Sequence, residues 1–299
     1  MVSFSCQSVA VLGLGLISGS LARALKASTW DGELIGWGPR EPSLALGLEL
    51  GVIDRYSLDL DEVLSIADMV VVGAPPKATG NLLADIVTRC ARLERSPVVT
   101  DMASIKGFVI NGPQQAYDRF VPAHPIAGSE HSGVQASDAS LFSGREVILT
   151  PLATTDTDAV EQVEAMWQLT GAYLRRMEVD QHDAVLASSS HMPHMVAYAL
   201  TAALADDSAE PTIHGGGALR DMTRIAGSDP TMWADIAETN RAALLTSIDQ
   251  FGEQMTRLRG LIEAGDDEAL KAYFLACREH RRAHDDILNP VQSEGVDTD

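Results

Sequence analysis

Short apolar runs alternate with helix-like segments through the first 178 residues of the chain. The runs are 8–14, 34–37, 69–73, 98–100 and 146–150, and the segments with helical spacing are 16–27, 42–50, 61–67 and 79–91. Continuous apolar runs separated by helices are typical of parallel strands that are buried on both faces. We therefore predict an α/β fold with a doubly wound parallel sheet.

After residue 180 the pattern changes to long segments rich in Ala, Leu and Met, at 185–205, 231–259 and 267–286. Such segments favour long helices, interrupted by the glycine turn at 215–217. We expect a strand-rich domain over 1–179, an all-α domain over 180–290 and an acidic tail over 291–299, with a cleft between the two domains.

The charge of the chain excludes several classes of partner. Asp and Glu number 42 against 22 Lys and Arg, a net charge of −20. Nucleic acid and anionic membrane surfaces attract basic faces, so neither is expected as a partner. An anionic substrate would need a few cations placed locally to receive it.

The chain is predicted to be cytoplasmic. Three widely spaced cysteines, Cys6, Cys90 and Cys277, match neither a disulfide framework nor a zinc site. No apolar run approaches the ~20 residues of a membrane span. The apolar stretch 9–27 is unlike a signal peptide, because no Lys or Arg precedes it and three glycines interrupt it.

A glycine signature lies between the first predicted strand and helix, in the run VLGLGLISGSLA. Gly13 would allow a tight turn, and Gly15 would let the backbone approach a pyrophosphate at the helix N-terminus. Ser18 holds the third fingerprint position, where a small side chain still permits close packing. This context predicts a Rossmann-type dinucleotide site; a turn that serves only packing is the alternative. The candidate cofactor-binding residues are Gly13, Gly15, Leu16, Ile17, Ser18, Gly38, Arg40, Ala74, Pro75 and Asp101.

The choice between NAD and NADP stays open. An acid at the end of the second strand would hold the ribose 2′-hydroxyl of NAD, but Gly38 occupies that position and Arg40 follows it. Arg40 could meet a 2′-phosphate, or it could be a solvated loop charge. The pattern slightly favours acceptance of NADP.

Candidate catalytic groups follow the fourth predicted strand of the sheet. The run DMASIKG places Ser104 and Lys106 at the carboxyl edge, where both could face the cleft. His124 ends an extended segment, and Glu130 lies in the loop beyond it. A histidine beside a cofactor cleft suits a general base, with an ordinary pKa of about 6.5, so activity should fall below pH ~6–7. A structural histidine is the alternative.

The helical half adds further polar candidates. His191 and His194 share one helix face and could bind a polar substrate, and no metal is expected because no third ligand is apparent. Asp221 could pair with Arg224 and orient its guanidinium toward a carboxylate. A surface salt bridge is the alternative.

Taken together, these motifs resemble the prephenate/arogenate dehydrogenase family of tyrosine biosynthesis. The resemblance spans residues 8–255 in the right order and rests on VLGLGLISGSLA, DMASIKG, HPIAGSEHSG, SHMPH and RDMTRIAGSDPTMW. Ser18 and Gly38 depart from the family pattern, and Gly38 leaves the cofactor choice undecided. The resemblance implies the catalytic core alone, without a chorismate mutase or ACT domain, and a homodimer formed through the helical domain.

The resemblance also implies an activity and roles for individual residues. Prephenate would be oxidised by NAD(P)+ and decarboxylated to 4-hydroxyphenylpyruvate. His124 would hold or remove the proton of the ring hydroxyl, and Ser104 would contact the same region and help to orient the histidine. The implied substrate-binding residues are Arg224, His191, His194, Glu130, Lys106 and Trp233.

Three alternatives to prephenate dehydrogenase remain. Arogenate differs from prephenate only in its side chain, and no residue distinguishes the two. A 3-hydroxyacid dehydrogenase would need a lysine base in the helical half, yet no lysine lies between Lys106 and Lys271. A non-catalytic NAD(P)-sensing regulator on the same fold would bind nucleotide without turnover.

Overall fold

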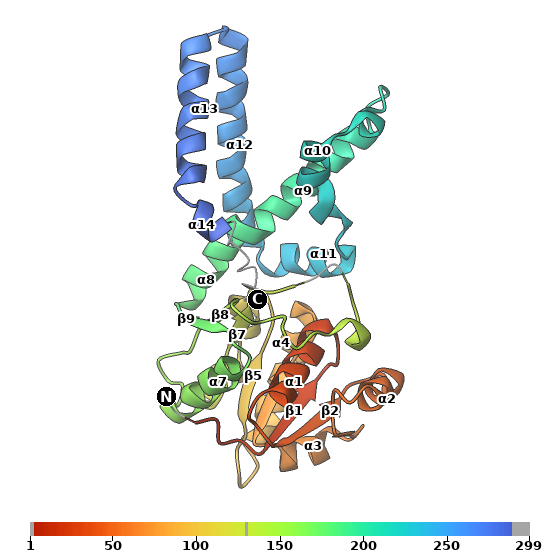
Figure 1. The fold of residues 1–299 in the computed structure, drawn as a ribbon. Helices are drawn as coiled ribbons and strands as arrows, with labels where there is room; N and C mark the ends of the chain where they lie inside the picture. The colour runs from red at the N-terminus through yellow and green to blue at the C-terminus, as the bar shows by residue number, and fades with distance from the viewer. Residues whose placement is uncertain (1–2, 129–130, 289–299) are drawn as a thin grey trace, which may run out of the picture. The chain divides into compact units, whose positions relative to one another are not determined.

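The computed structural model describes residues 3–128 and 131–288 and divides into two compact units, Met1–Leu244 and Leu245–Asp299 (Figure 1). The first unit holds every strand and most of the helices. Glu130 and the acidic tail predicted over 291–299 lie outside the described residues.

The first unit is built on a six-stranded sheet in the order β3-β2-β1-β4-β5-β6. All neighbouring strands are parallel, which confirms the predicted fold class. The strands are β1 (Ser8–Leu12), β2 (Glu33–Trp37), β3 (Arg55–Tyr56), β4 (Met69–Val72), β5 (Val98–Asp101) and β6 (Phe120–Val121). The apolar runs did not predict β3 and β6, because each has only two residues.

Successive residues of a strand point to opposite faces of the sheet, and both faces are covered. Val9 and Val11 pack with residues of α1 (Leu16–Ala27), α2 (Glu41–Glu49) and α7 (Thr157–Leu169). Ala10 and Leu12 pack with residues of α3 (Leu60–Ile66), α4 (Pro76–Cys90) and α5 (Lys106–Val109). The strands are therefore apolar without alternation, and the sheet is doubly wound.

The apolar run 146–150 was wrongly assigned to the parallel sheet. It forms β8 (Glu146–Leu149) of a second sheet, between β7 (Ala123–Pro125) and β9 (Tyr173–Arg176). β8 pairs antiparallel with β7 and parallel with β9. A short apolar run does not reveal its partner strand, and the pairing depends on the path of the chain after His124.

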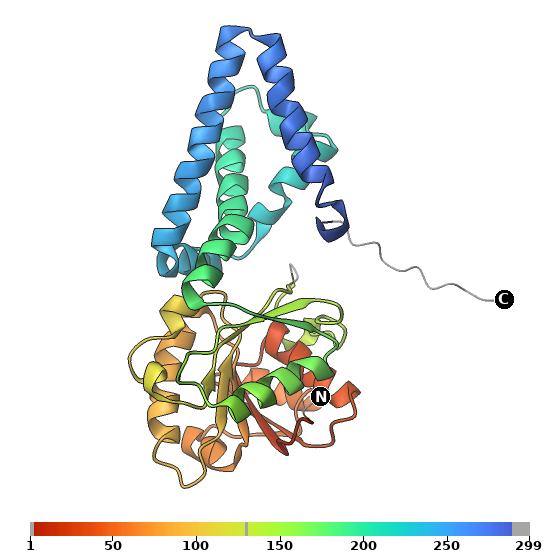
Figure 2. The ribbon, with the colours of Figure 1, turned by 90° about the vertical axis from the view of Figure 1, so that its left-hand side faces the viewer.

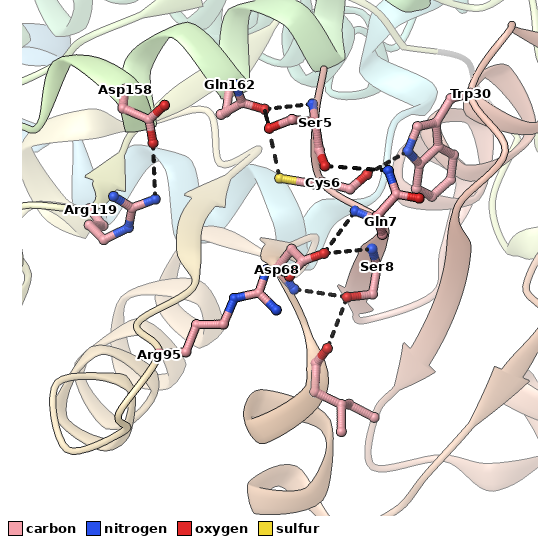
Figure 3. Close-up of polar contacts among 11 residues, drawn as sticks. Ser5, Cys6, Gln7, Ser8, Trp30, Asp68, Arg95, Arg119, Asp158 and Gln162 are labelled. Atoms are coloured by element: carbon pink, nitrogen blue, oxygen red, sulfur yellow. Dashed lines mark hydrogen bonds and ion pairs between the residues drawn. The ribbon is translucent and has the colours of Figure 1, made fainter. Parts of the chain in front are cut away.

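The amino-terminal edge of the large sheet is tied together by hydrogen bonds (Figure 3). Gln162 on α7 accepts hydrogen bonds from the backbone N–H and the hydroxyl of Ser5, at 2.8 and 3.0 Å. Asp68 accepts from the N–H groups of Gln7 and Ser8, at 2.7 and 3.1 Å. These contacts attach residues 5–8 at the sheet edge opposite the glycine turn.

The helical segment of the first unit follows β9. It comprises α8 (Val179–Leu186), a π-helical turn (Ala187–His191), α9 (Met192–Ala205), α10 (Gly217–Thr223) and α11 (Pro230–Thr239). Lys77 on α4 binds Glu238 and Asp235 on α11, at 2.6 and 3.2 Å. The helix predicted over 231–259 is in fact two, because α11 ends at Thr239, Asn240 caps it, and α12 (Arg241–Ala264) begins after the cap.

The second unit contains the greater part of α12 together with α13 (Asp267–Arg282) and α14 (Asp285–Leu288). α12 and α13 form a helical hairpin (Figure 2), with the guanidinium of Arg257 5.4 Å from the ring centre of Tyr273. A groove between them is lined by Leu261, Ala272 and the exposed Cys277, among others.

The thiols of Cys6 and Cys90 are buried, in contrast to that of Cys277. Within residues 3–128 and 131–288, no helix combines the length and apolarity needed to cross a membrane. The remaining short helices are α6 (Pro113–Ala116) and the 3₁₀ turns Val134–Ala136, Pro211–His214 and Arg224–Gly227.

Candidate active site

The turn between β1 and α1 requires glycine at its first position. Gly13 has a φ of +87°, and a Cβ there would lie 2.6 Å from the carbonyl oxygen of Gly73. Ser18 reinforces the turn, since its hydroxyl donates to the Gly13 carbonyl (2.5 Å) and accepts from the Gly15 N–H (2.9 Å). Ser18 at the third fingerprint position therefore stabilises the turn by hydrogen bonds, in addition to being small enough for close packing.

The residues expected to bind a cofactor meet around this turn. Gly15 opens α1, and a Cβ added there would have no atom within 4 Å, which leaves space in front of the helix N-terminus. The Gly13 N–H donates to Trp37 at the end of β2 (2.8 Å), next to Gly38. Ala74 follows β4, and its backbone also lies close to Gly13. A dinucleotide pyrophosphate fits this arrangement, with Leu16 and Ile17 in the first turn of the helix.

Two other candidates, Arg40 and Pro75, are exposed at the starts of helices. Arg40 precedes α2, and Pro75 precedes α4. Both lie just beyond the carboxyl ends of β2 and β4, where a bound nucleotide would extend from the glycine turn.

Asp101 and Lys106 do not face the cleft as expected. Both side chains are fully buried, and the Lys106 ammonium lies 2.6 Å from the Asp101 carboxylate. Lys106 also donates to the carbonyl of Ala123 (2.6 Å), while the Ala123 N–H donates to Asp101 (3.3 Å). Together, Asp101 and Lys106 thus bind both the N–H and the carbonyl of Ala123, the residue before His124. The sequence could not predict this, because an Asp and a Lys after a strand look the same whether they bind a ligand or form a buried ion pair.

His124 lies on β7 and is only 8% exposed. Its Nδ1 is 2.9 Å from Nε2 of His182, and the two rings meet edge to face. Nδ1 of His182 lies 2.7 Å from the carboxylate of Asp183. His124, His182 and Asp183 therefore form a continuous hydrogen-bonded chain from β7 to α8.

Asn240 links this chain to His191. Its amide donates to the backbone carbonyl of Asp183 (2.9 Å) and lies 3.1 Å from Nδ1 of His191. His191 ends the π-helical turn, a feature that is frequent at functional sites. His182, Asp183 and Asn240 were missed from the sequence, because their partners are 49–77 residues away.

His194 stacks on Trp233, with ring centres 3.6 Å apart and planes inclined by 22°. Its Nδ1 donates to the carbonyl of Ser190 (2.9 Å). Trp233 is buried against Ile105, which follows the half-buried Ser104. The structure thus brings His194 and Trp233 of the helical segment close to the turn that carries Ser104.

Arg224 is exposed at the end of α10. The expected pairing of Asp221 with Arg224 is wrong: among the described residues Asp221 makes its ion pair with Arg220, at 3.4 Å. Arg224 carries no salt bridge in that part of the chain, so its guanidinium is available to an anionic ligand.

The histidines of the site are held neutral. Burial holds the pKa of His124 well below its usual 6.5, and the neighbouring His182 and Lys106 lower that pKa further. Burial likewise lowers the pKa of His191 to about 4. Burial and the nearby Arg224 lower the pKa of His194, against the opposing hydrogen bond to Ser190. The acid limb expected near pH 6–7 therefore moves to lower pH.

A glycine turn at the carboxyl edge of a parallel sheet, in a chain that also carries a buried neutral histidine after the same sheet, is typical of the class of dinucleotide-dependent oxidoreductases. Residues 21–176 match the prephenate dehydrogenase nucleotide-binding domain, and residues 178–276 match the prephenate dehydrogenase dimerisation domain. The chain belongs to the prephenate dehydrogenase family.

Known relatives cover nearly the whole chain. A cyclohexadienyl dehydrogenase of Zymomonas mobilis is 34% identical over 93% of this chain and 96% of its own length. A prephenate dehydrogenase of Bacillus subtilis is 32% identical over 92% of this chain and 75% of its own. The prephenate dehydrogenase of A. aeolicus, solved with hydroxyphenyl propionate and NAD+, has a TM-score of 0.87, at 31% identity over 94% of this chain and 99% of its own.

Proposed function

We propose that the chain catalyses the NAD(P)+-dependent oxidative decarboxylation of prephenate to 4-hydroxyphenylpyruvate. The family membership supports this reaction, and the observation that carries it is the state of His124. His124 is buried, and the residue before it is hydrogen-bonded to Asp101 at the carboxyl end of β5. A histidine in that position can accept the proton of a hydroxyl group while hydride leaves the carbon that bears the hydroxyl.

The chemistry asks the protein to position the substrate and to move one proton to and from His124. The nicotinamide, when bound, accepts the hydride from ring carbon C4. His124 takes the proton of the C4 hydroxyl, and a dienone forms whose ring double bonds link the new carbonyl to the positions next to the carbon bearing the ring carboxylate. The electrons released with CO2 can therefore pass through the ring to the carbonyl oxygen. Loss of CO2 then makes the ring aromatic, and His124 can return its proton to the phenolate oxygen. Aromatisation drives the reaction forward, so the residues mainly align the substrate.

The remaining polar groups suit a dianionic substrate. Arg224 would bind a carboxylate, for which its planar guanidinium is well matched. His194 and His191 would contact the substrate from the helical segment beside Trp233. Ser104 would contact the region of the ring hydroxyl and help to orient His124. We include Glu130 in the substrate site on the family resemblance alone.

The residues that follow β2 determine the choice between NAD+ and NADP+. A relative is crystallised with NAD+, so NAD+ is the first cofactor to test. In this chain Gly38 offers no acid to the ribose, and the exposed Arg40 would favour a 2′-phosphate. We therefore propose that NADP+ is also accepted.

We further propose a homodimer in the cytoplasm. The match of residues 178–276 to a dimerisation domain supports association of two copies. In the second unit, the side chains of Phe274, Leu275 and Ile262 are exposed, which is typical of a surface that another subunit covers.

The first test is the formation of NAD(P)H at 340 nm with prephenate and with arogenate, each against NAD+ and NADP+. We expect turnover of prephenate with both cofactors. Turnover of arogenate but not of prephenate would show that arogenate is the substrate. Absence of turnover in all four combinations, with nucleotide binding intact by calorimetry, would favour the sensing regulator.

Replacing Arg224 with alanine should raise the KM for prephenate by about 10- to 100-fold, the loss of one charge-assisted hydrogen bond, and lower kcat less. Steady-state kinetics at saturating cofactor measure both constants. Arg89→Ala is the matched control, because Arg89 pairs with Asp85 and Asp61 at the surface. An unchanged KM in Arg224→Ala would remove Arg224 from carboxylate binding.

A further inference from the structure

The ring of His124 has two nitrogens, and only one of them can act as the base. In a neutral imidazole one nitrogen carries the proton and the other carries a lone pair. Which nitrogen is protonated depends on the hydrogen bond that the ring makes. For His124 that bond joins Nδ1 to Nε2 of His182, so the protonation of His182 decides the question.

The protonation of His182 follows from its other neighbour. An ionised carboxylate only accepts hydrogen bonds, so Nδ1 of His182 must donate to Asp183. Burial would raise the pKa of Asp183, but the hydrogen bonds from His182, Lys106 and Gly107 outweigh it and hold that pKa below its usual value. Burial lowers the pKa of His182. His182 is thus neutral, and its Nε2 carries a lone pair.

We propose that His182 and Asp183 are positioning residues that fix the tautomer of His124. Because Nε2 of His182 accepts, Nδ1 of His124 donates, and the lone pair of His124 is left on Nε2. That nitrogen is then the one that takes the proton of the substrate hydroxyl. The assignment rests on the proposed dehydrogenase function and goes beyond it, since neither residue touches the reacting atoms.

Asp183 is itself held in place from three directions. Its carboxylate accepts from the backbone N–H groups of Lys106 (2.9 Å) and Gly107 (2.8 Å), at the start of α5. Its carbonyl accepts from Asn240. A Cβ at residue 107 would lie 2.8 Å from the Asp183 carboxylate, so glycine lets the acid approach the backbone this closely. The acid that orients His182 is therefore rigid.

The other polar groups near His124 do not compete for its Nδ1. Lys106 is bound to Asp101 and to the Ala123 carbonyl, and His191 is bound through Nδ1 to Asn240. When His124 takes the substrate proton, its Nδ1–H keeps the bond to His182. The Asp183 carboxylate then stabilises the positive charge through the His182 ring.

Two substitutions at His182 separate hydrogen bonding from packing. His182→Gln places an amide oxygen near the position of Nε2 and keeps an acceptor for His124. His182→Leu fills similar space without an acceptor. We expect kcat to fall at least ~10-fold in the leucine variant, with the KM for prephenate and NAD+ within ~3-fold of the parent, and to recover largely in the glutamine variant.

A control variant accounts for loss of stability. Gln162→Leu also removes a buried polar side chain, but at the opposite edge of the sheet (Figure 3). It should lower the melting temperature without changing kcat per folded molecule. If His182→Leu changes only the melting temperature, or if both His182 variants lose kcat equally, the positioning role is wrong.

The tautomer can be measured on the parent protein without any turnover. In 15N-labelled protein near neutral pH, we expect His124 to show a protonated Nδ1 and an unprotonated Nε2, with signals assigned by their loss in His124→Asn. The opposite pattern would overturn the proposal even for an active enzyme. A parent that fails to oxidise prephenate but shows the expected pattern would contradict the proposed function and leave the hydrogen-bond assignment intact.

Discussion

Replacing His124 with asparagine should lower kcat by about 10²–10⁴-fold and leave the KM for prephenate nearly unchanged. The loss corresponds to removal of a general base, and binding survives because Arg224 and the helical histidines remain. A large rise in KM with a normal kcat would instead make His124 a binding residue.

The pH dependence of kcat gives a second view of the same residue. A general base works when it is deprotonated, so kcat falls as the pH drops through its pKa. Burial, together with the neighbouring His182 and Lys106, holds the pKa of His124 well below 6.5, so kcat should be flat from pH 8 to pH 6.5 and decline only at lower pH. The residual activity of His124→Asn should lack that decline; the same acid limb in both proteins would remove the assignment.

Replacing Lys106 with methionine should destabilise the first unit by about 3–5 kcal/mol, the largest stability effect that we expect. Methionine matches the length of the side chain but leaves the Asp101 carboxylate buried without its counter-ion. The double variant Asp101→Asn/Lys106→Met removes both charges and should recover much of the loss. Urea denaturation monitored by circular dichroism measures the shift in midpoint.

The matched control is Lys26→Met. Lys26 also lies 2.6 Å from a carboxylate, that of Asp54, but both side chains are partly exposed to solvent. Exposed ion pairs contribute little, so the midpoint should hardly move. Equal midpoint shifts in Lys26→Met and Lys106→Met would show that burial of the Asp101–Lys106 pair does not cause the loss of stability.

The parts of the fold set by local physics could be predicted from the sequence. Strands buried on both faces leave continuous apolar runs, as in β1 and β4, and the turn at Gly13 leaves its glycines. The two-residue strands β3 and β6 leave no such run. The second sheet was missed for a different reason: pairing of β7 with β8 joins segments more than 20 residues apart.

The residues of the candidate site also differ in whether the sequence indicates them. His124 stood out because a histidine ended an extended segment beside a predicted cleft. Nothing near His182 or Asp183 in the sequence indicates that they meet it, since a His–Asp pair early in a helix usually faces solvent. Lys106 was expected in the cleft because a lysine after a strand end is equally consistent with a ligand contact and a buried ion pair. Only the tertiary contact with Asp101 distinguishes them.

The unequal surroundings of the three cysteines have a practical consequence for measuring assembly. Burial raises the pKa of Cys6 and of Cys90 to about 12, so neither thiol offers a reactive thiolate near neutral pH. Cys277 is exposed in the groove between α12 and α13. A maleimide spin label or fluorophore would therefore attach at one place per chain without any cysteine having to be removed. In a labelled sample, the distance between two such probes reports directly on how two copies approach each other.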